Sequence, residues 1–238
     1  MHGLIIFLLL LVLMLTGMPI SIALGLTVLT FLFTMTTVPL ESVALKLFTG
    51  IENFEIMAIP FFILAGNFLT HGGVARRMIR FATSMVGHWY GGLGLSGVVA
   101  CALFAAVSGS SPATVVAIGS ILMPAMVRAG FPNRFGAGVI TTSGALGILI
   151  PPSIVMVMYS VATNTSVGAL FMAGVVPGIV LALVLGGVTW FRAWRSKLPR
   201  QRPASWGERA RAFRDSVWGL LLIIVVMGGI YTGIFTPT

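Results

Sequence analysis

Two clusters of glycine, proline and hydroxylated residues interrupt long apolar stretches of this sequence. The first, residues 108–112, reads SGSSP, and no Asp, Glu, Lys or Arg occurs anywhere in residues 81–127. The second, residues 141–153, contains the runs TTSGALG and PPS. A turn that rests in the water interface usually carries charged or aromatic anchors, and residues 108–112 have none beside them. The sequence therefore predicts two helix breaks at membrane depth.

Such breaks have the chemistry of a binding site. Irregular backbone inside a membrane is tolerated only where it is buried in protein or lines a cavity. It exposes carbonyl oxygens, which together with hydroxyls suit a hard cation such as Na⁺. The N-termini of the helix halves attract anionic groups such as carboxylates. The candidate residues are Ser108, Gly109, Ser110, Ser111, Pro112, Thr114, Thr141, Thr142, Ser143, Gly144, Gly147, Pro151, Pro152 and Ser153.

Each cluster also has a purely structural explanation. Residues 108–112 suit an ordinary turn between two full spans, because their flanking arms are long enough to cross a membrane. Gly144 and Gly147 suit small-residue notches for helix packing. Pro151 and Pro152 suit a simple kink. These alternatives stay open at the level of sequence.

The composition is that of a membrane protein with several helical spans. Of 238 residues, 58% are hydrophobic and 8% are charged, whereas soluble domains carry about 25% charged residues. The apolar runs are continuous and do not alternate, which excludes a membrane β-barrel. The net charge of +9 does not indicate nucleic-acid binding, because the basic residues form short clusters between apolar runs. We predict an all-α fold with about 6–7 spans and one re-entrant helical hairpin.

The order of the predicted elements follows from hydropathy and from Gly and Pro positions. One ambiguity concerns residues 4–35, which form either one kinked helix or two spans; two are favoured because Pro19 suits the first turn of a new helix. Residues 37–55 suit an amphipathic surface segment. The predicted organisation is scaffold-type spans in 1–71, an amphipathic surface helix in 72–90, the re-entrant hairpin in 91–130, a broken span in 131–166, a span in 167–191, a polar loop in 192–215 and a further span from 216 to 238.

The positive-inside rule gives an orientation. With the N-terminus outside and two spans before residue 37, the basic regions 76–80, 128–134 and 192–214 all face the cytoplasm. They contain every Lys and Arg except Lys46. The N-terminus is therefore predicted to be periplasmic and loop 192–215 cytoplasmic.

An enzyme is not expected. Residues 94–97 read GLSG, a form seen around intramembrane serine nucleophiles, but such a serine needs a general base, and no histidine follows His88. Neither a His-Glu-x-x-His metal motif nor a phosphate-binding Gly-x-x-x-x-Gly-Lys loop is present. A channel would carry polar or charged rings along its pore, and the spans show none. A non-transporting scaffold or a passive channel subunit is the alternative to a transporter.

The clusters and two further motifs resemble one known family. The motifs are SGSSPAT in 108–114 followed by IGS in 118–120, IPFFILAG in 59–66, GILIPPS in 147–153, and GALF in 168–171 followed by Gly174 and Pro177-Gly178. Together they resemble the large membrane subunit of tripartite ATP-independent periplasmic (TRAP) transporters, most closely the C4-dicarboxylate branch. The resemblance runs from end to end of the chain.

The resemblance implies a Na⁺-driven secondary transporter for an organic acid, with an elevator mechanism, in the bacterial inner membrane. Its implied partners are a small four-helix membrane subunit and a periplasmic substrate-binding protein, with Na⁺ as coupling ion and no other cofactor. Na⁺ would lie near Ser108, Ser110, Ser111 and Gly144. Many members of this family carry an acidic residue where Thr114 stands, whereas others have Ser-Pro-Ala-Thr as here.

The resemblance also implies a second half. Relatives are roughly twice as long. A short run ending in Thr16-Gly17 and Pro19 is similar to one ending in Thr232-Gly233 and Pro237, as expected of inverted repeats. We expect the chain to be the first half of such a protein, as a fragment, a split-gene product or a truncation, and to be unable to transport alone.

Overall fold

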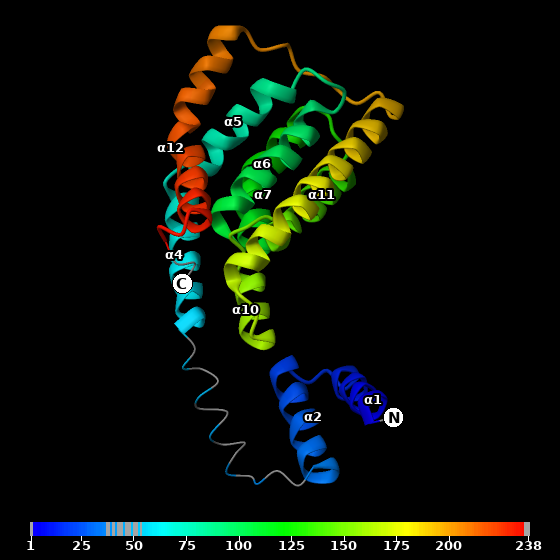
Figure 1. The fold of residues 1–238 in the computed structure, drawn as a ribbon. Coiled ribbons are helices and arrows are strands. Elements are labelled where there is room, and N and C mark those ends of the chain that lie inside the picture. Colours follow the sequence, from blue (N-terminus) through cyan, green and yellow to red (C-terminus); the bar gives the residue numbers. More distant parts are fainter. Residues whose placement is uncertain are drawn as a thin grey trace. The chain divides into compact units, whose positions relative to one another are not determined.

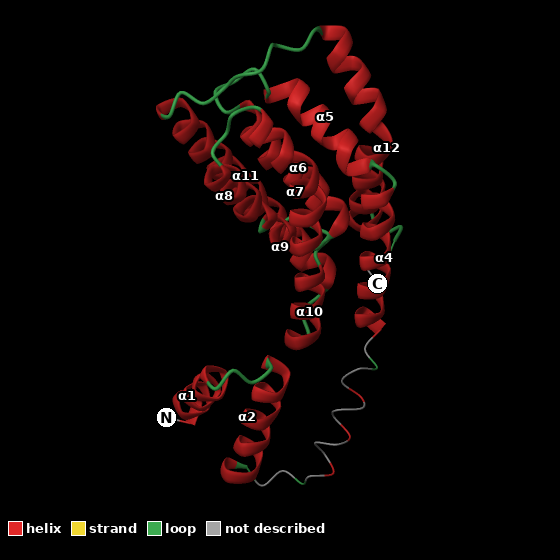
Figure 2. Ribbon diagram, turned by 180° about the vertical axis from the view of Figure 1, so that it is seen from behind, coloured by secondary structure: helices red, strands yellow, loops and turns green. Residues whose placement is uncertain are grey.

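The computed structural model describes residues 2–36 and 54–235, together with isolated positions between them. The chain forms two compact units, Met1–Asn53 and Phe54–Thr238. Every regular element within the described ranges is a helix, as Figure 2 shows. The all-α fold class is therefore confirmed.

The first unit contains two helices that pack against each other, α1 (His2–Leu15) and α2 (Ile20–Met35). Gly17 lies in the left-handed region, with φ of 79°, and Pro19 occupies the position before α2. A left-handed glycine ends a helix because only glycine adopts that backbone without a steric cost. Two elements over residues 4–35, rather than one kinked helix, are thus confirmed. The surface segment predicted for 37–55 lies largely outside the described residues.

The second unit is built around an antiparallel helical hairpin. It comprises the short 3₁₀ helix η1 (Phe54–Met57), α4 (Ala58–His71), α5 (Val74–Val86), α6 (Gly92–Ser108), α7 (Ser111–Arg128), α8 (Asn133–Gly144), α9 (Leu146–Leu149), α10 (Ile154–Thr163), α11 (Val167–Arg195) and α12 (Trp206–Tyr231). Helices α6 and α7 form the hairpin; α5 and α12 pack on one side of it, and α8 and α11 on the other (Figure 1).

Helix α5 packs its apolar face against protein. Ala75, Met78 and Ala82 are fully buried, in a core shared with α6 and α7, and α12 also packs against α5. The arginines of α5, at positions 76, 77 and 80, are all exposed. Met85 and Trp89, which the sequence places on the same apolar face as Met78, are also exposed. An orientation of α5 in the membrane plane stays a prediction.

Besides packing against α5, α12 is linked to it by a hydrogen bond from a hydroxyl. Ser216 is 1% exposed, and its hydroxyl donates a 2.9 Å hydrogen bond to the Arg77 carbonyl. We expect Ser216→Ala to lower the free energy of unfolding by about 1 kcal/mol, the usual net contribution of such a bond, measured by thermal unfolding in detergent. Ser120→Ala is the control, because that hydroxyl bonds only to Ala117 of its own helix. Equal effects of the two substitutions would contradict a role for Ser216 in joining helices.

The predicted polar loop 192–215 is too long. Helix α11 continues to Arg195 and α12 already begins at Trp206, so the connection covers only residues 196–205. A capping box starts α12: the Ser205 hydroxyl accepts from the Glu208 amide at 3.3 Å, and the Glu208 carboxylate accepts from the Ser205 amide at 2.7 Å. Of the ten charged residues in 192–215, seven are therefore helical and three, Lys197, Arg200 and Arg202, lie in the connection. The last element starts ten residues before residue 216.

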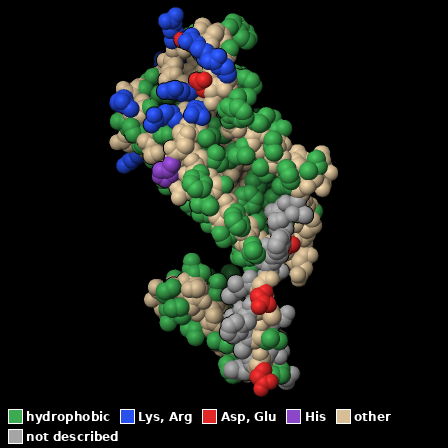
Figure 3. Space-filling model, turned by 90° about the vertical axis from the view of Figure 1, so that its left-hand side faces the viewer, with side chains coloured by type: hydrophobic (Ala, Val, Ile, Leu, Met, Phe, Trp, Pro, Cys, Tyr) green, Lys and Arg blue, Asp and Glu red, His purple; other side chains and the backbone are tan. Residues whose placement is uncertain are grey.

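Several helices have the length and composition of a membrane span. Among the described helices, α7, α11 and α12 qualify alone, and up to five spans result if each of two bent pairs counts as one. Helices α1, α2 and α6 are apolar but shorter. The predicted total of 6–7 spans therefore stays a prediction. On the face shown in Figure 3, Lys and Arg side chains gather toward one end of the second unit, with apolar side chains over much of the rest.

Helices α1 and α12 end in the same local structure. Thr16 and Thr232 each turn their hydroxyl back to a carbonyl of their own helix. Gly17 and Gly233 follow with φ of 79° and 75°. The short sequence similarity between these two helix ends therefore extends to their backbone.

Candidate functional site

The first break is a tight turn whose residues each satisfy a backbone requirement. Helix α6 ends at Ser108, and Gly109 takes the left-handed conformation with φ of 61°. Ser110 caps α7, its hydroxyl accepting from the Ala113 amide at 3.4 Å. Pro112 stands in the first turn of α7, where its missing N–H costs nothing. A break between two helices at residues 108–112 is therefore confirmed, whereas its re-entrant position inside the membrane stays a prediction.

Two buried hydroxyls stabilise this turn. Ser108 is 1% exposed and Thr114 is 0% exposed. The Thr114 hydroxyl donates to the Ser110 carbonyl at 2.8 Å and lies 3.0 Å from the Ser108 hydroxyl. Because Thr114 uses its proton on Ser110, Ser108 donates to Thr114. These hydroxyls are thus already engaged in holding the turn, so Ser108 offers a ligand chiefly through its backbone carbonyl at the end of α6.

The second break contains two buried hydroxyls without partners. Helices α8 and α9 are separated at Ala145, and a bend of 43° separates them from α10. Pro151-Pro152 is a cis peptide within this bend. Ser143 and Ser153 are both 0% exposed, and neither hydroxyl has a hydrogen-bond partner among the described residues. Buried polar groups are nearly always satisfied, and these two hydroxyls are not used by other described protein groups, so they are available to a ligand.

The two breaks contact each other although they are far apart in sequence. The Ile154 amide donates to the Gly109 carbonyl at 3.0 Å. A Cβ added to Gly109 would lie 2.8 Å from the Pro152 carbonyl oxygen. A Cβ added to Gly147 would lie 2.8 Å from the Ser111 amide nitrogen. Backbone therefore packs directly on backbone, and only glycine permits this approach at either position.

Glycines on two further helices enclose this contact. A Cβ on Gly66 of α4 would lie 3.5 Å from Cβ of Ser108. On α11, a Cβ on Gly174 would lie 2.7 Å from the Leu149 carbonyl oxygen, and one on Gly178 would lie 2.9 Å from the Ile150 side chain. These glycines were not among the residues predicted for the site. A signal was available for Gly174 and Gly178, since a spacing of four on an apolar helix marks a close-packed face.

Not every candidate residue reaches the contact. Thr141 and Thr142 are exposed, and their hydroxyls bond back to Ala137 and Gly138 of their own helix at 2.6 and 2.7 Å. Pro112 is exposed as well. Gly144 is buried, and a Cβ there would overlap the Val115 side chain of α7. The inward-facing hydroxyl of this segment is therefore Ser143, not either threonine.

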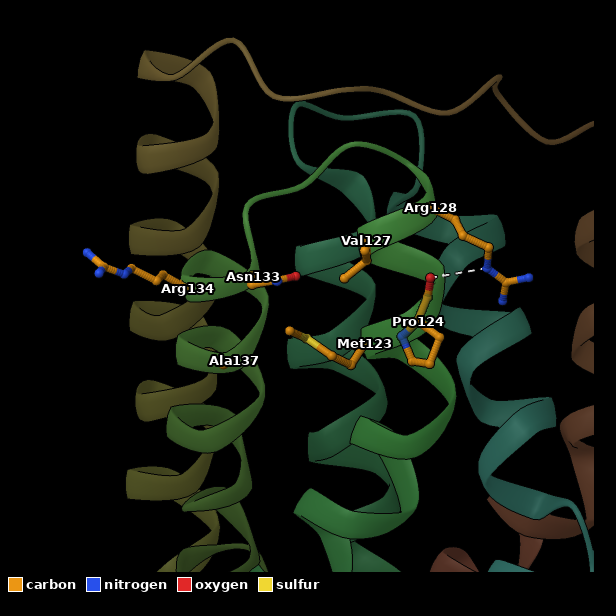
Figure 4. Close-up of a pocket in the computed structure, with 7 residues that line it drawn as sticks. All are labelled: Met123, Pro124, Val127, Arg128, Asn133, Arg134 and Ala137. Atoms are coloured by element: carbon orange, nitrogen blue, oxygen red, sulfur yellow. Dashed lines mark hydrogen bonds between the residues drawn. The ribbon is translucent and has the colours of Figure 1, made fainter.

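A hollow of about 760 Å³ lies at the end of α7 that is far from the turn. Met123, Val127 and Asn133 border it, and Figure 4 shows the Arg128 and Arg134 side chains directed away from it. The Arg128 Nε–H donates to the Pro124 carbonyl of its own helix at 3.2 Å. Neither guanidinium faces the hollow, so it lacks the convergent polar groups that a ligand site needs.

The family of the chain follows from comparison with known proteins. The family described as Tripartite ATP-independent periplasmic transporter, DctM component, matches residues 7–238. The chain belongs to this family. The resemblance inferred from the two clusters and the accompanying motifs is confirmed, and a DctM-family chain with these apolar helices is a multi-pass membrane protein of a transporter family.

Three DctM relatives are highly similar. The C4-dicarboxylate TRAP transporter large permease protein of Rhodobacter capsulatus is 72% identical over 252 residues, covering 100% of this chain and 57% of that protein. Proteins of the same name from Pseudomonas aeruginosa and Vibrio cholerae are 56% and 52% identical over 198 and 233 residues. These matches cover 83% and 98% of this chain but 46% and 51% of the relatives. The chain spans about half the length of the curated relatives it matches.

Proposed function

We propose that this chain supplies the first half of the transport site in a Na⁺-driven TRAP permease that carries an organic acid by an elevator mechanism. The observation that carries the proposal is the backbone contact between the turn at Gly109 and the break at Pro151–Ser153. It brings irregular backbone from two helices to one place inside a membrane protein, which is tolerated chiefly at functional sites. The names of the relatives support a C4-dicarboxylate as the substrate.

The residues at this contact fit Na⁺. The available donors are hydroxyl and carbonyl oxygens, which hard cations prefer, and no cluster of three or more His, Cys, Asp or Glu side chains occurs in the described part of the chain. Two of the hydroxyls, on Ser143 and Ser153, are buried and unpartnered. We place the ion near Ser108, Ser110, Ser111 and Gly144, with these two hydroxyls as additional ligands.

An anionic substrate fits the same place. Helix α7 begins at Ser111 and α10 begins at Ile154, and the Ile154 amide contacts the turn itself. The first N–H groups of a helix lack intrahelical acceptors and carry partial positive charge. Two helix N-termini directed toward one region would bind a carboxylate without an Arg or Lys side chain.

Orientation and partners complete the proposal. The basic residues at the ends of α7 and α11 and in the 196–205 connection support a cytoplasmic location for these ends and a periplasmic N-terminus in a bacterial inner membrane. A small four-helix membrane subunit and a periplasmic binding protein that delivers the substrate are the proposed partners. No nucleic acid is involved.

Bulky residues in the turn test this function. We expect Ser110→Trp and Ser111→Trp, in the intact transporter assembled with its partners, to reduce Na⁺-driven dicarboxylate uptake to background without preventing membrane insertion. The physical reason is that both side chains are only partly exposed at the packed turn. Ser120→Trp, on an exposed position of α7, is the control. Unchanged uptake would reduce the turn to a structural connection.

The alternative functions give different signals. Uptake that collapses with the Na⁺ gradient supports coupled transport. Ohmic current through reconstituted protein would instead indicate a passive channel. Neither uptake nor current, in a correctly inserted and fully assembled complex, would indicate a scaffold.

A further inference from the structure

An apolar groove of about 420 Å³ runs between α6 and α11, two helices that lie side by side in both ribbon views (Figures 1 and 2). Leu95 and Leu103 of α6 line one wall, and Leu183 and Gly187 of α11 line the other. No charged side chain lines it. The groove is therefore suited to a hydrocarbon chain along its length.

One end of the groove is aromatic and basic. Trp89 and Trp190 border both the groove and a second hollow of about 350 Å³, whose other lining residues are His88, Tyr90 and Arg200. The two hollows thus adjoin at the tryptophans. Tryptophan is enriched where membrane proteins cross the lipid headgroup region. This end of the groove consequently has the composition expected at the membrane–water boundary.

The basic group at this end is held in place. The Arg200 guanidinium carbon lies 3.5 Å from the centroid of the Tyr90 ring, a cation–π contact. The next residue, Gln201, donates its amide to the Gly87 carbonyl at 3.1 Å, which fixes the segment beside the groove. His88 Nδ1 is buried and has no partner among the residues that the structure describes. Arg200 is exposed and held over a ring, and His88 still has a ring nitrogen without a partner, so both side chains can bind an anion.

We propose that this groove binds an anionic phospholipid, with one acyl chain between α6 and α11 and the phosphate between Arg200 and His88. A soluble anion would leave the apolar groove unfilled, and a neutral hydrocarbon would leave Arg200 and His88 without an acceptor. Arginine binds phosphate through paired N–H groups. The hollow between α7 and α8 is a contrast within the same chain, because both of its arginines point away from it (Figure 4). The proposal depends on the chain lying in a membrane and not on the transport function.

Tryptophan fluorescence tests the proposal directly. The full chain, with Trp194, Trp206 and Trp218 replaced by Phe, retains only the two tryptophans of the groove. It is reconstituted into phosphatidylcholine vesicles that contain a small, fixed fraction of brominated phosphatidylglycerol or brominated phosphatidylcholine. Bromine quenches tryptophan only at close range. We expect the brominated phosphatidylglycerol to quench several-fold more strongly at the same fraction.

Matched variants identify the residues responsible. Arg200→Ala should abolish the preference for phosphatidylglycerol, whereas Arg202→Ala, which removes the same charge from the same segment, should retain it. Gly187 has no atom within 4 Å of an added Cβ, so Gly187→Leu should fill the groove and lower quenching by both lipids. Gly228→Leu, with equal space on α12, should not.

Three results would overturn the proposal. The first is equal quenching by the two brominated lipids in the parent protein. The second is a preference for phosphatidylglycerol that survives Arg200→Ala, and the third is a preference that falls equally with Arg202→Ala, since both would assign the effect to general surface charge. If Arg200→Ala does not fold, Tyr90→Leu replaces it: the charge stays but loses the ring that positions it, and the preference should fall. A preference that persists in folded Tyr90→Leu also contradicts the proposal.

Discussion

Replacing Gly147 by alanine is expected to reduce Na⁺-driven uptake by the intact transporter more than tenfold while the protein still inserts into the membrane. The added Cβ would lie 2.8 Å from the Ser111 amide nitrogen, 2.9 Å from the Ser110 carbonyl carbon and 3.0 Å from Ser111 Cα. All three are backbone atoms of the hairpin turn, so no side-chain rotation relieves the overlap. The turn and the second break would have to separate.

The energetic cost of this substitution is moderate, but its location gives it a large functional effect. Overpacking a well-packed interior costs about 1–3 kcal/mol, which a folded protein generally survives. The displacement, however, falls where Gly109 accepts the Ile154 amide, at the contact we assign to the site. Uptake is measured together with the amount of protein inserted in the membrane, which separates this loss of function from a failure to fold.

A pair of neighbouring glycines provides the internal control. At Gly144 the added Cβ would overlap the side chain of Val115. The double substitution Gly144→Ala with Val115→Ala removes this overlap and should therefore give normal uptake. At Gly147 the obstruction is backbone, and Ser111→Gly should not restore it. Gly138→Ala, where nothing lies within 4 Å, should be neutral. Normal uptake by Gly147→Ala would show that the close contact is not needed for transport.

The turn at residues 108–112 was predictable because each residue acts locally. Gly109 is left-handed, Ser110 caps a helix and Pro112 occupies a first turn, and each role depends on the residue's own chemistry. The cap at Ser205 and Glu208 was equally local. It was missed because charge was taken as a sign of a loop, although charged side chains at a membrane boundary are compatible with a continuing helix.

The partners of the turn were not predictable in the same way. Gly66 of α4 approaches the turn at Ser108, and Gly174 of α11 approaches the second break at Leu149. Nothing near either glycine in sequence indicates which surface it contacts. Within 141–143 the sequence offers three adjacent hydroxyls, and successive helical residues point about 100° apart. Only the packing of α8 selects Ser143 as the buried one. Local chemistry thus predicts the breaks, and tertiary packing decides which side chains face them.

Ser143→Ala and Ser153→Ala provide the sharpest test of a Na⁺ site, because ligand and packing roles predict different results. Both hydroxyls are fully buried without a hydrogen-bond partner among the described residues. If they bind nothing, removing them should leave stability unchanged or raise it by about 1–3 kcal/mol, the usual cost of an unsatisfied buried group. If the hydroxyls bind Na⁺, each substitution removes an interaction with a charged group. The Na⁺ concentration that gives half-maximal uptake should then rise roughly ten- to hundred-fold.

Two measurements and one control decide between these roles. Uptake is recorded against Na⁺ concentration, and thermal unfolding is recorded in Na⁺ and in choline. A ligand role predicts that the substitutions remove the stabilisation that Na⁺ gives the parent protein, because an ion that binds only the folded state raises its stability.

Ser96 is the matched control: it is also 0% exposed, but its hydroxyl donates to the Gly92 carbonyl at 2.6 Å. Ser96→Ala should therefore lower stability and leave the Na⁺ dependence intact. An unchanged Na⁺ dependence in both Ser143→Ala and Ser153→Ala, with stability equal to or above that of the parent, would remove these hydroxyls from the ion site and leave only backbone carbonyls to form it.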